Sequence, residues 1–125
     1  MKYLSFLLTV SLLFFSCKEK TDVRIHILGD STTEQQDQNL KIQRGWPQML
    51  SSFFTNHVTV LNHGKSGTSS RTFYEGIWWK NARKTIHPGD YVVIQFGHND
   101  EKHQGFDGPT GTVANASYRE YLQKF

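Results

Sequence analysis

Three short polar motifs in this sequence bring together groups that act on carbonyl compounds. The first is Gly29-Asp30-Ser31-Thr32-Thr33. Its glycine permits a tight turn, after which Ser31 presents its hydroxyl and its backbone N–H at one place. A serine hydroxyl is a nucleophile for acyl transfer when a base activates it. An ordinary turn capped by aspartate or serine has the same residue types, so this motif alone does not decide the chemistry.

The other two motifs supply hydrogen-bond donors. Residues 62–69 (Asn-His-Gly-Lys-Ser-Gly-Thr-Ser) form a loop of small residues around Gly67, in which backbone N–H groups can approach a bound oxygen. Residues 97–100 (Gly-His-Asn-Asp) place Asn99 where its amide can donate to a developing oxyanion. Each also has a simpler interpretation, as a glycine loop and an Asn-Asp turn. Their joint placement, each after a predicted strand, is the stronger indication of a site.

Three further residues within or beside the motifs are candidates for lining that site. Asp30 precedes the serine, His98 flanks Asn99, and Arg71 follows the second motif. For His98 a structural or substrate-lining role is favoured over proton transfer. Arg71 either meets an acidic polysaccharide such as pectin or is a solvated residue at a helix start. The histidines lack the paired spacing of metal ligands and the chain has one cysteine, so we expect no metal centre.

Predicted strands at 23–28, 58–62 and 91–96 precede the three motifs. Helical patterns are found at three places: 45–54, 77–86 and 117–125. The first predicts an amphipathic helix packed on the sheet, and the last begins with a capping-box pattern of Ser117 and Glu120. Residues 101–116 read as a surface loop. This alternation predicts an α/β fold, a three-layer α/β/α sandwich with a parallel, doubly wound sheet, whose ligand sites lie at the carboxyl ends of the strands.

The N-terminal segment predicts export. A positive start at Lys2 precedes an apolar run at 3–15, which is short for a membrane span and typical of a signal-peptide core. The run ends at Cys17, and this resembles a bacterial lipoprotein processing site with Cys17 as the lipidated residue. We therefore expect a signal peptide at 1–17, a polar spacer at 18–22 and a membrane anchor in the cell envelope. Plain secretion or a periplasmic location is the alternative.

Composition favours one globular domain. The 125 residues are 37% hydrophobic and 14% aromatic. The net charge of +3 comes from lysines and arginines scattered without a dense run, which argues against nucleic-acid binding.

Together the three motifs resemble blocks I, II and III of the GDSL/SGNH hydrolase superfamily. The tracts Gly-Asp-Ser-Thr-Thr, Gly-Trp-Pro and Phe-Gly-His-Asn-Asp are most similar to its rhamnogalacturonan acetylesterase branch. The resemblance covers the chain from about Val23 onward. It implies a flavodoxin-like α/β fold and a serine esterase that removes acetyl or short acyl groups from plant cell-wall carbohydrate. It also implies Ser31 as nucleophile, an oxyanion hole made by the N–H groups of Ser31 and Gly67 with the Asn99 amide, and no metal or organic cofactor.

The family pattern is incomplete in this sequence. The family takes its activating base from an Asp-x-x-His block near the C-terminus, which lies beyond the part of the pattern present here. One string with that spacing exists, from Asp100 to His103, but Asp100 already belongs to the third motif, so we do not expect His103 to be the base. We interpret 23–125 as a partial SGNH hydrolase domain with its C-terminal part missing, and its activity alone stays open.

Two other functions are compatible with this sequence. One is a non-catalytic surface lipoprotein that binds carbohydrate on the same scaffold. The other is a flavodoxin-like nucleotide-binding module, which is disfavoured because Asp30 stands where a phosphate would approach. Whatever the function, a sheet of three strands leaves an edge uncovered. We therefore expect the isolated chain to be marginally stable or prone to aggregation.

Overall fold

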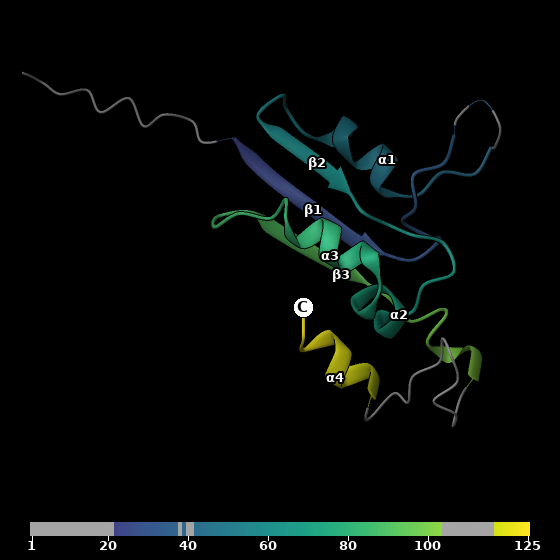
Figure 1. Ribbon diagram of the computed structural model, residues 1–125. Coiled ribbons are helices and arrows are strands. Elements are labelled where there is room, and N and C mark those ends of the chain that lie inside the picture. The colour runs from purple at the N-terminus through teal and green to yellow at the C-terminus, as the bar shows by residue number, and fades with distance from the viewer. Residues whose placement is uncertain (1–21, 38, 40–41, 104–116) are drawn as a thin grey trace, which may run out of the picture.

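The computed structural model describes residues 22–37, 39, 42–103 and 117–125. Three strands form a parallel sheet in the order β2-β1-β3 (Figure 1), and they are β1 (Val23–Gly29), β2 (Val58–Asn62) and β3 (Tyr91–Gln95). The three predicted strands are confirmed, with ends that differ by one residue at most. The predicted signal peptide with Cys17, nearly all of the spacer, and most of the predicted loop at 101–116 lie outside the described residues.

The strand order places β1 at the centre, where the direction of winding reverses. From β1 the chain moves outward to β2, and it then crosses back to pair β3 with the other side of β1. Because such crossovers are right-handed, the two connections run over opposite faces of the sheet. The predicted α/β fold with a parallel, doubly wound sheet is therefore confirmed. In such sheets the ligand site lies at the reversal, outside the carboxyl ends of the strands.

Short helices flank the sheet (Figure 1). The helical elements are α1 (Pro47–Leu50), η1 (Ser51–Phe53), α2 (Ser70–Glu75), α3 (Ile77–Arg83), η2 (Glu101–His103) and α4 (Arg119–Leu122). The sequence did not predict α2, which begins with a capping box. The Ser69 hydroxyl accepts from the Thr72 N–H, and the Thr72 hydroxyl accepts from the Ser69 N–H.

One prediction about a helix was wrong in detail. The amphipathic helix at 45–54 is a single turn followed by a 3-10 turn, and Met49 and Phe53 are 55% and 80% exposed. One turn is too short to keep a stripe of apolar side chains on the sheet. The helix predicted at 117–125 is observed as α4, which begins after Tyr118. The capping box of Ser117 and Glu120 stays a prediction.

The core lies on the side of the sheet covered by α2 and α3. Leu28, Phe73 and Ala82 are buried there, and aromatic side chains pack around them: Trp79, Phe96 and Phe125. The ring of Phe125 lies 5.1 Å from that of Trp79 and 5.7 Å from that of Phe96. These ring contacts pack Phe125 against Trp79 on α3 and against Phe96, which directly follows β3.

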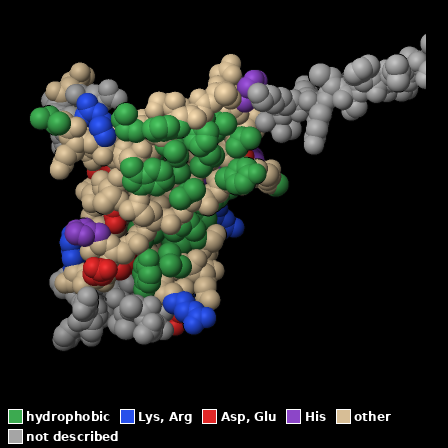
Figure 2. Space-filling view, turned by 180° about the vertical axis from the view of Figure 1, so that it is seen from behind, with side chains coloured by type: hydrophobic (Ala, Val, Ile, Leu, Met, Phe, Trp, Pro, Cys, Tyr) green, Lys and Arg blue, Asp and Glu red, His purple; other side chains and the backbone are tan. Residues whose placement is uncertain are grey.

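The opposite face carries much hydrophobic surface. Seen from behind in Figure 2, apolar side chains gather across the middle of the molecule. The apolar residues of β3 at 91–94 are all exposed, Tyr91 the most at 63%. Within the described residues β3 pairs with β1 alone, so its other edge is open. No helix in the described part of the chain is both long and apolar enough for a membrane span.

Candidate active site

The turn after β1 holds Ser31 through hydrogen bonds to Asp30. The buried Asp30 carboxylate accepts from the N–H and the hydroxyl of Thr32, each at 2.9 Å. The Asp30 carbonyl accepts from the N–H groups of Thr33 and Glu34, each at 3.1 Å. Asp30 therefore shapes the turn from within, while Ser31 stays partly exposed. The structure places both predicted residues at the carboxyl end of β1.

Two glycines allow neighbouring segments to approach this turn closely. A Cβ on Gly29 would lie 2.6 Å from the carbonyl oxygen of Gln95, and one on Gly64 would lie 2.2 Å from Thr33 Oγ1. The φ angle of Gly29 is not positive. Its role in the predicted tight turn is thus to leave space for Gln95 and for Thr33 of the turn.

The loop after β2 is fastened to the serine turn. The Lys65 N–H donates to the Gly29 carbonyl at 2.9 Å, and Asn62 Nδ2 donates to the Thr33 carbonyl at 2.6 Å. Further along this loop Gly67 has a φ of 79°, a left-handed conformation that favours glycine, and it is exposed with open space around it. The first residues of the second motif thus contact the serine turn, and Gly67 further along the motif is exposed to solvent.

An ion pair lies beside the same loop. Lys65 Nζ is 3.1 Å from Glu34 Oε1. Partial burial raises the pKa of the Glu34 carboxyl, but the hydrogen bonds from Lys65 and from the Ser66 N–H outweigh it and hold the pKa below its usual value. Glu34 therefore stays ionised and paired at neutral pH.

The third motif orients Asn99 at both ends of its amide. The side chain is 2% exposed, Nδ2 donates to the Thr68 carbonyl at 2.8 Å, and Oδ1 accepts from Lys102 Nζ at 2.6 Å. An amide nitrogen carries two hydrogens, so the bond to Thr68 uses one of them. A charged donor on Oδ1 also polarises the amide, which strengthens its N–H groups as donors.

The neighbouring Asp100 fastens this motif to α2. Its carboxylate is buried and accepts from the Ser70 N–H at 3.1 Å and from the Ser70 hydroxyl at 2.6 Å. These two hydrogen bonds hold Asp100 against the first turn of α2. His103 ends η2, and its side chain lies outside what the structure describes.

The two remaining candidates lie at the margins. His98 is exposed in the turn after β3, and Arg71 is half-buried in the first turn of α2. Among the described residues no cluster of three or more histidine, cysteine or acidic side chains has the arrangement of a metal site.

The structure thus joins the three motifs through continuous hydrogen bonding. The serine turn contacts the loop after β2, and that loop contacts the third motif through Thr68 and Ser70. Sequence reasoning did not single out Thr68, Ser70 or Lys102. The available signals were the position of Thr68 and Ser70 within three residues after Gly67, and the three-residue spacing from Asn99 to Lys102.

Comparison with known proteins agrees with this geometry. Residues 27–125 match the GDSL-like Lipase/Acylhydrolase family. The rhamnogalacturonan acetylesterase RhgT of Bacillus subtilis is 33% identical over 106 residues, which cover 85% of this chain and 43% of that protein. The probable rhamnogalacturonan acetylesterase YesY of the same organism is 33% identical over 104 residues, 81% of this chain and 45% of that protein.

A solved structure shows the same fold. The crystal structure of the Bacillus subtilis protein YxiM superposes with a TM-score of 0.59 at 34% identity, over 66% of this chain and 24% of that one. The chain spans less than half the length of the curated relatives RhgT and YesY. Since the family match runs from within β1 to the last residue, the chain belongs to the GDSL-like lipase/acylhydrolase family.

Proposed function

We propose that the protein is a serine ester hydrolase that removes acetyl or other short acyl groups from cell-wall carbohydrate such as rhamnogalacturonan. The observation that carries this proposal is the hydrogen bonding that joins the serine turn, the Gly67 loop and Asn99 at the carboxyl ends of adjacent strands. The names of the similar proteins RhgT and YesY support the substrate class.

In the proposed reaction Ser31 Oγ attacks the ester carbonyl carbon and the carbonyl oxygen becomes an oxyanion. The N–H groups of Ser31 and Gly67 and the second Nδ2 hydrogen of Asn99 donate to that oxygen. The sugar hydroxyl then leaves with a proton, and water hydrolyses the acyl-serine to release acetate. Donors held in place before the reaction stabilise the oxyanion without reorganising, which is why the fixed amide of Asn99 matters.

The proposal requires a base for Ser31. Four described histidines have hydrogen bonds to groups other than Ser31: His26, His57, His63 and His87. For His98 a substrate-lining role is favoured over proton transfer. We assign the base to an Asp-x-x-His block of the kind that the family carries near its C-terminus.

We also propose that the protein is exported and anchored in the bacterial envelope through Cys17. This rests on the sequence of residues 1–20 alone. Metabolic labelling with radioactive palmitate should mark the wild-type protein and leave the Cys17→Ala variant unlabelled. Equal labelling of both would contradict the anchor.

The activity is tested by acetate release from acetylated rhamnogalacturonan, using the whole protein that contains this sequence. We expect Ser31→Ala to abolish release, while Ser51→Ala, an exposed serine on η1, releases acetate at the wild-type rate. Turnover by Ser31→Ala would overturn the assignment of the nucleophile. A wild-type protein that binds the polymer without releasing acetate would instead support a non-catalytic carbohydrate-binding lipoprotein.

A further inference from the structure

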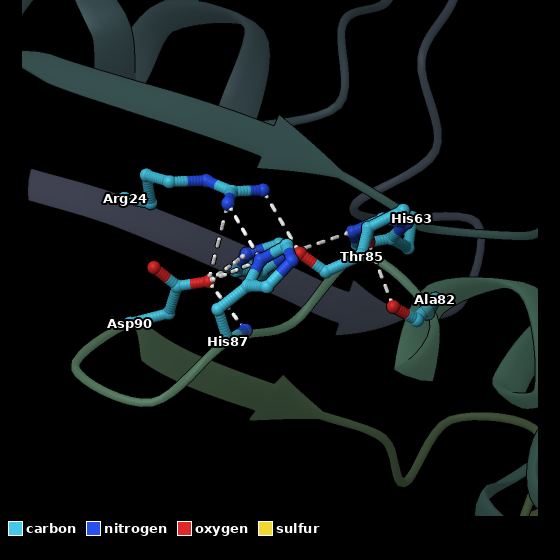
Figure 3. Close-up of polar contacts among 7 residues, drawn as sticks. Arg24, His63, Ala82, Thr85, His87 and Asp90 are labelled. Carbon is cyan, nitrogen blue, oxygen red and sulfur yellow. Dashed lines mark hydrogen bonds and ion pairs between the residues drawn. The ribbon is translucent and has the colours of Figure 1, made fainter.

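A chain of hydrogen-bonded side chains, centred on the buried His26, connects β1 with the segments that follow β2 and precede β3. His26 on β1 is fully buried, and both of its ring nitrogens have partners. These partners are His63 and Asp90, both labelled in Figure 3. Nδ1 lies 3.0 Å from Nε2 of His63, and Nε2 lies 3.0 Å from Oδ2 of Asp90. These three residues come from β1, from the end of β2 and from the approach to β3, so we call them the Asp90–His26–His63 relay.

The chemistry of the partners fixes which nitrogens carry hydrogen. An ionised carboxylate can only accept, so His26 Nε2 donates to Asp90. In a neutral His26 the other nitrogen, Nδ1, is then an acceptor, and His63 must donate to it through Nε2–H. The two rings are also stacked, with centroids 5.3 Å apart and planes inclined by 5°. Both orientation and tautomer of His63 are thus set by residues on other strands.

Several contacts hold the Asp90 carboxylate, which forms one end of the relay. Its carboxylate accepts from the His87 N–H at 2.8 Å and lies 3.7 Å from Nη1 of Arg24. Nη2 of the same guanidinium donates to the Thr85 carbonyl. The His87 N–H, followed by the His26 hydrogen bond and the Arg24 charge, lowers the pKa of the Asp90 carboxyl. The relay therefore ends on a carboxylate that is ionised at neutral pH.

At its other end the relay meets the candidate active site. The His63 N–H donates to the Ile27 carbonyl at 2.8 Å, extending the pairing of β2 with β1 by one residue. The next residue, Gly64, packs against the serine turn, and Gly67 lies three residues beyond it. A shift of the His63 ring would therefore move the start of the loop that carries Gly67.

We propose that His63 is a positioning residue of the active site, and that the Asp90–His26–His63 relay holds the loop at 63–69 in the place where Gly67 can donate to the oxyanion. The inference rests on the proposed function for its catalytic meaning. The relay itself can be tested without turnover.

The test compares His63→Leu with His63→Gln, because the glutamine Nε2 retains a donor for His26 Nδ1 and leucine does not. The matched control is His57→Leu, a histidine at the start of β2 whose ring contacts Asp22 rather than the relay. Backbone amide resonances of the isotope-labelled whole protein report the position of Gly67, and kcat and KM for its acetate release report catalysis. Thermal unfolding of every variant shows whether it folds.

We expect His63→Leu to shift the Gly67 amide resonance and to lower kcat by about 10- to 100-fold with KM little changed, since small misplacements of catalytic groups have effects of that size. His63→Gln should restore most of the wild-type position of the Gly67 resonance and most of kcat. His57→Leu should change neither the resonance nor kcat. In the wild type, an imidazole N–H of His26 or His63 should exchange slowly with water. Equal losses in His63→Leu and His63→Gln, or an unshifted Gly67 amide in folded His63→Leu, would overturn the inference.

Failure of the proposed function gives a different pattern. In that case Ser31→Ala would release acetate at the wild-type rate or the wild type would release none, while the Gly67 shift and its rescue by glutamine would remain. A His63→Leu variant that does not fold is replaced by Asp90→Asn, which keeps an acceptor but removes the charge. An unshifted Gly67 amide there, in a folded variant whose His26 ring proton has lost its protection, would also overturn the inference.

Discussion

Two hydrogen bonds hold the side-chain amide of Asn99. Its Nδ2 donates to the Thr68 carbonyl, and its Oδ1 accepts from Lys102 Nζ. Replacing it with aspartate preserves the shape but removes the Nδ2 hydrogens and adds a negative charge near the oxyanion. We expect Asn99→Asp to lower kcat by about 100-fold or more, the usual cost of losing an oxyanion donor. Steady-state acetate release measures it, with the exposed Asn81→Asp on α3 as control. A rate equal to wild type would remove Asn99 from the mechanism.

At this scale the sequence located the motif residues but not their partners. Ser31, Gly67 and Asn99 each lie within a short motif of four to eight consecutive residues, and the three motifs together were enough to indicate the site. Lys102 and Ser70 are ordinary in sequence. Their roles depend on how η2 and α2 pack against the third motif, which no local pattern encodes.

Among the elements, α2 is held at its start by a buried carboxylate from the third motif. Asp100 accepts from both the N–H and the hydroxyl of buried Ser70 in the first turn of this helix. Removing the carboxylate leaves those donors buried and unpaired, at about 1–3 kcal/mol for each. We expect Asp100→Ala to lower the free energy of unfolding by such an amount, as measured in urea, and exposed Asp37→Ala to change it little. In a double-mutant cycle with Ser70→Ala the two losses should be less than additive, and full additivity would show that the contact contributes nothing.

The strands were predicted better than the helices for a physical reason. Each strand is a short segment of alternating or continuous apolar residues bounded by turn residues, and a segment of this length carries its whole signal locally. The helix α2 follows a glycine loop and is only six residues long, so its capping box at Ser69 was read as part of the loop. The helix α1 had a convincing apolar stripe, yet it ends after one turn and leaves Phe53 in solvent.

For the molecule as a whole, stability should fall as the pH is lowered. Burial, and then the neighbouring His26, lower the pKa of His63 in the folded protein. The unfolded chain then binds more protons as the pH drops through about 6.5, the ordinary value for histidine, so folding is disfavoured there. Asp90 and Glu34 have lowered pKa values as well, and their stabilisation is lost below about pH 4.

We therefore expect two successive decreases in the free energy of unfolding on acidification, followed by chemical denaturation at each pH. His63→Gln should remove the upper decrease and leave the lower one. The upper decrease should persist in His57→Gln. A His63→Gln profile that overlays the wild type would contradict this assignment.

The open edge of β3 should govern association of the 125-residue chain. Its exposed apolar residues at 91–94 present unpaired backbone groups, the arrangement from which sheets extend into other molecules. We expect concentration-dependent association in sedimentation velocity, reduced by Tyr91→Lys and unaffected by Thr59→Lys on β2. A wild-type chain that stays monomeric at all concentrations and unfolds cooperatively would contradict both this and the expected marginal stability.

The most direct test of the central claim is covalent labelling of the whole protein with a fluorophosphonate, followed by mass spectrometry of its peptides. An activated serine oxygen attacks phosphorus and displaces fluoride, so the label marks the nucleophile itself. We predict a single phosphonylated site at Ser31, absent in Ser31→Ala and retained in Ser51→Ala. Labelling at another residue, or no labelling in a preparation that releases acetate, would contradict the assignment of Ser31 as the nucleophile.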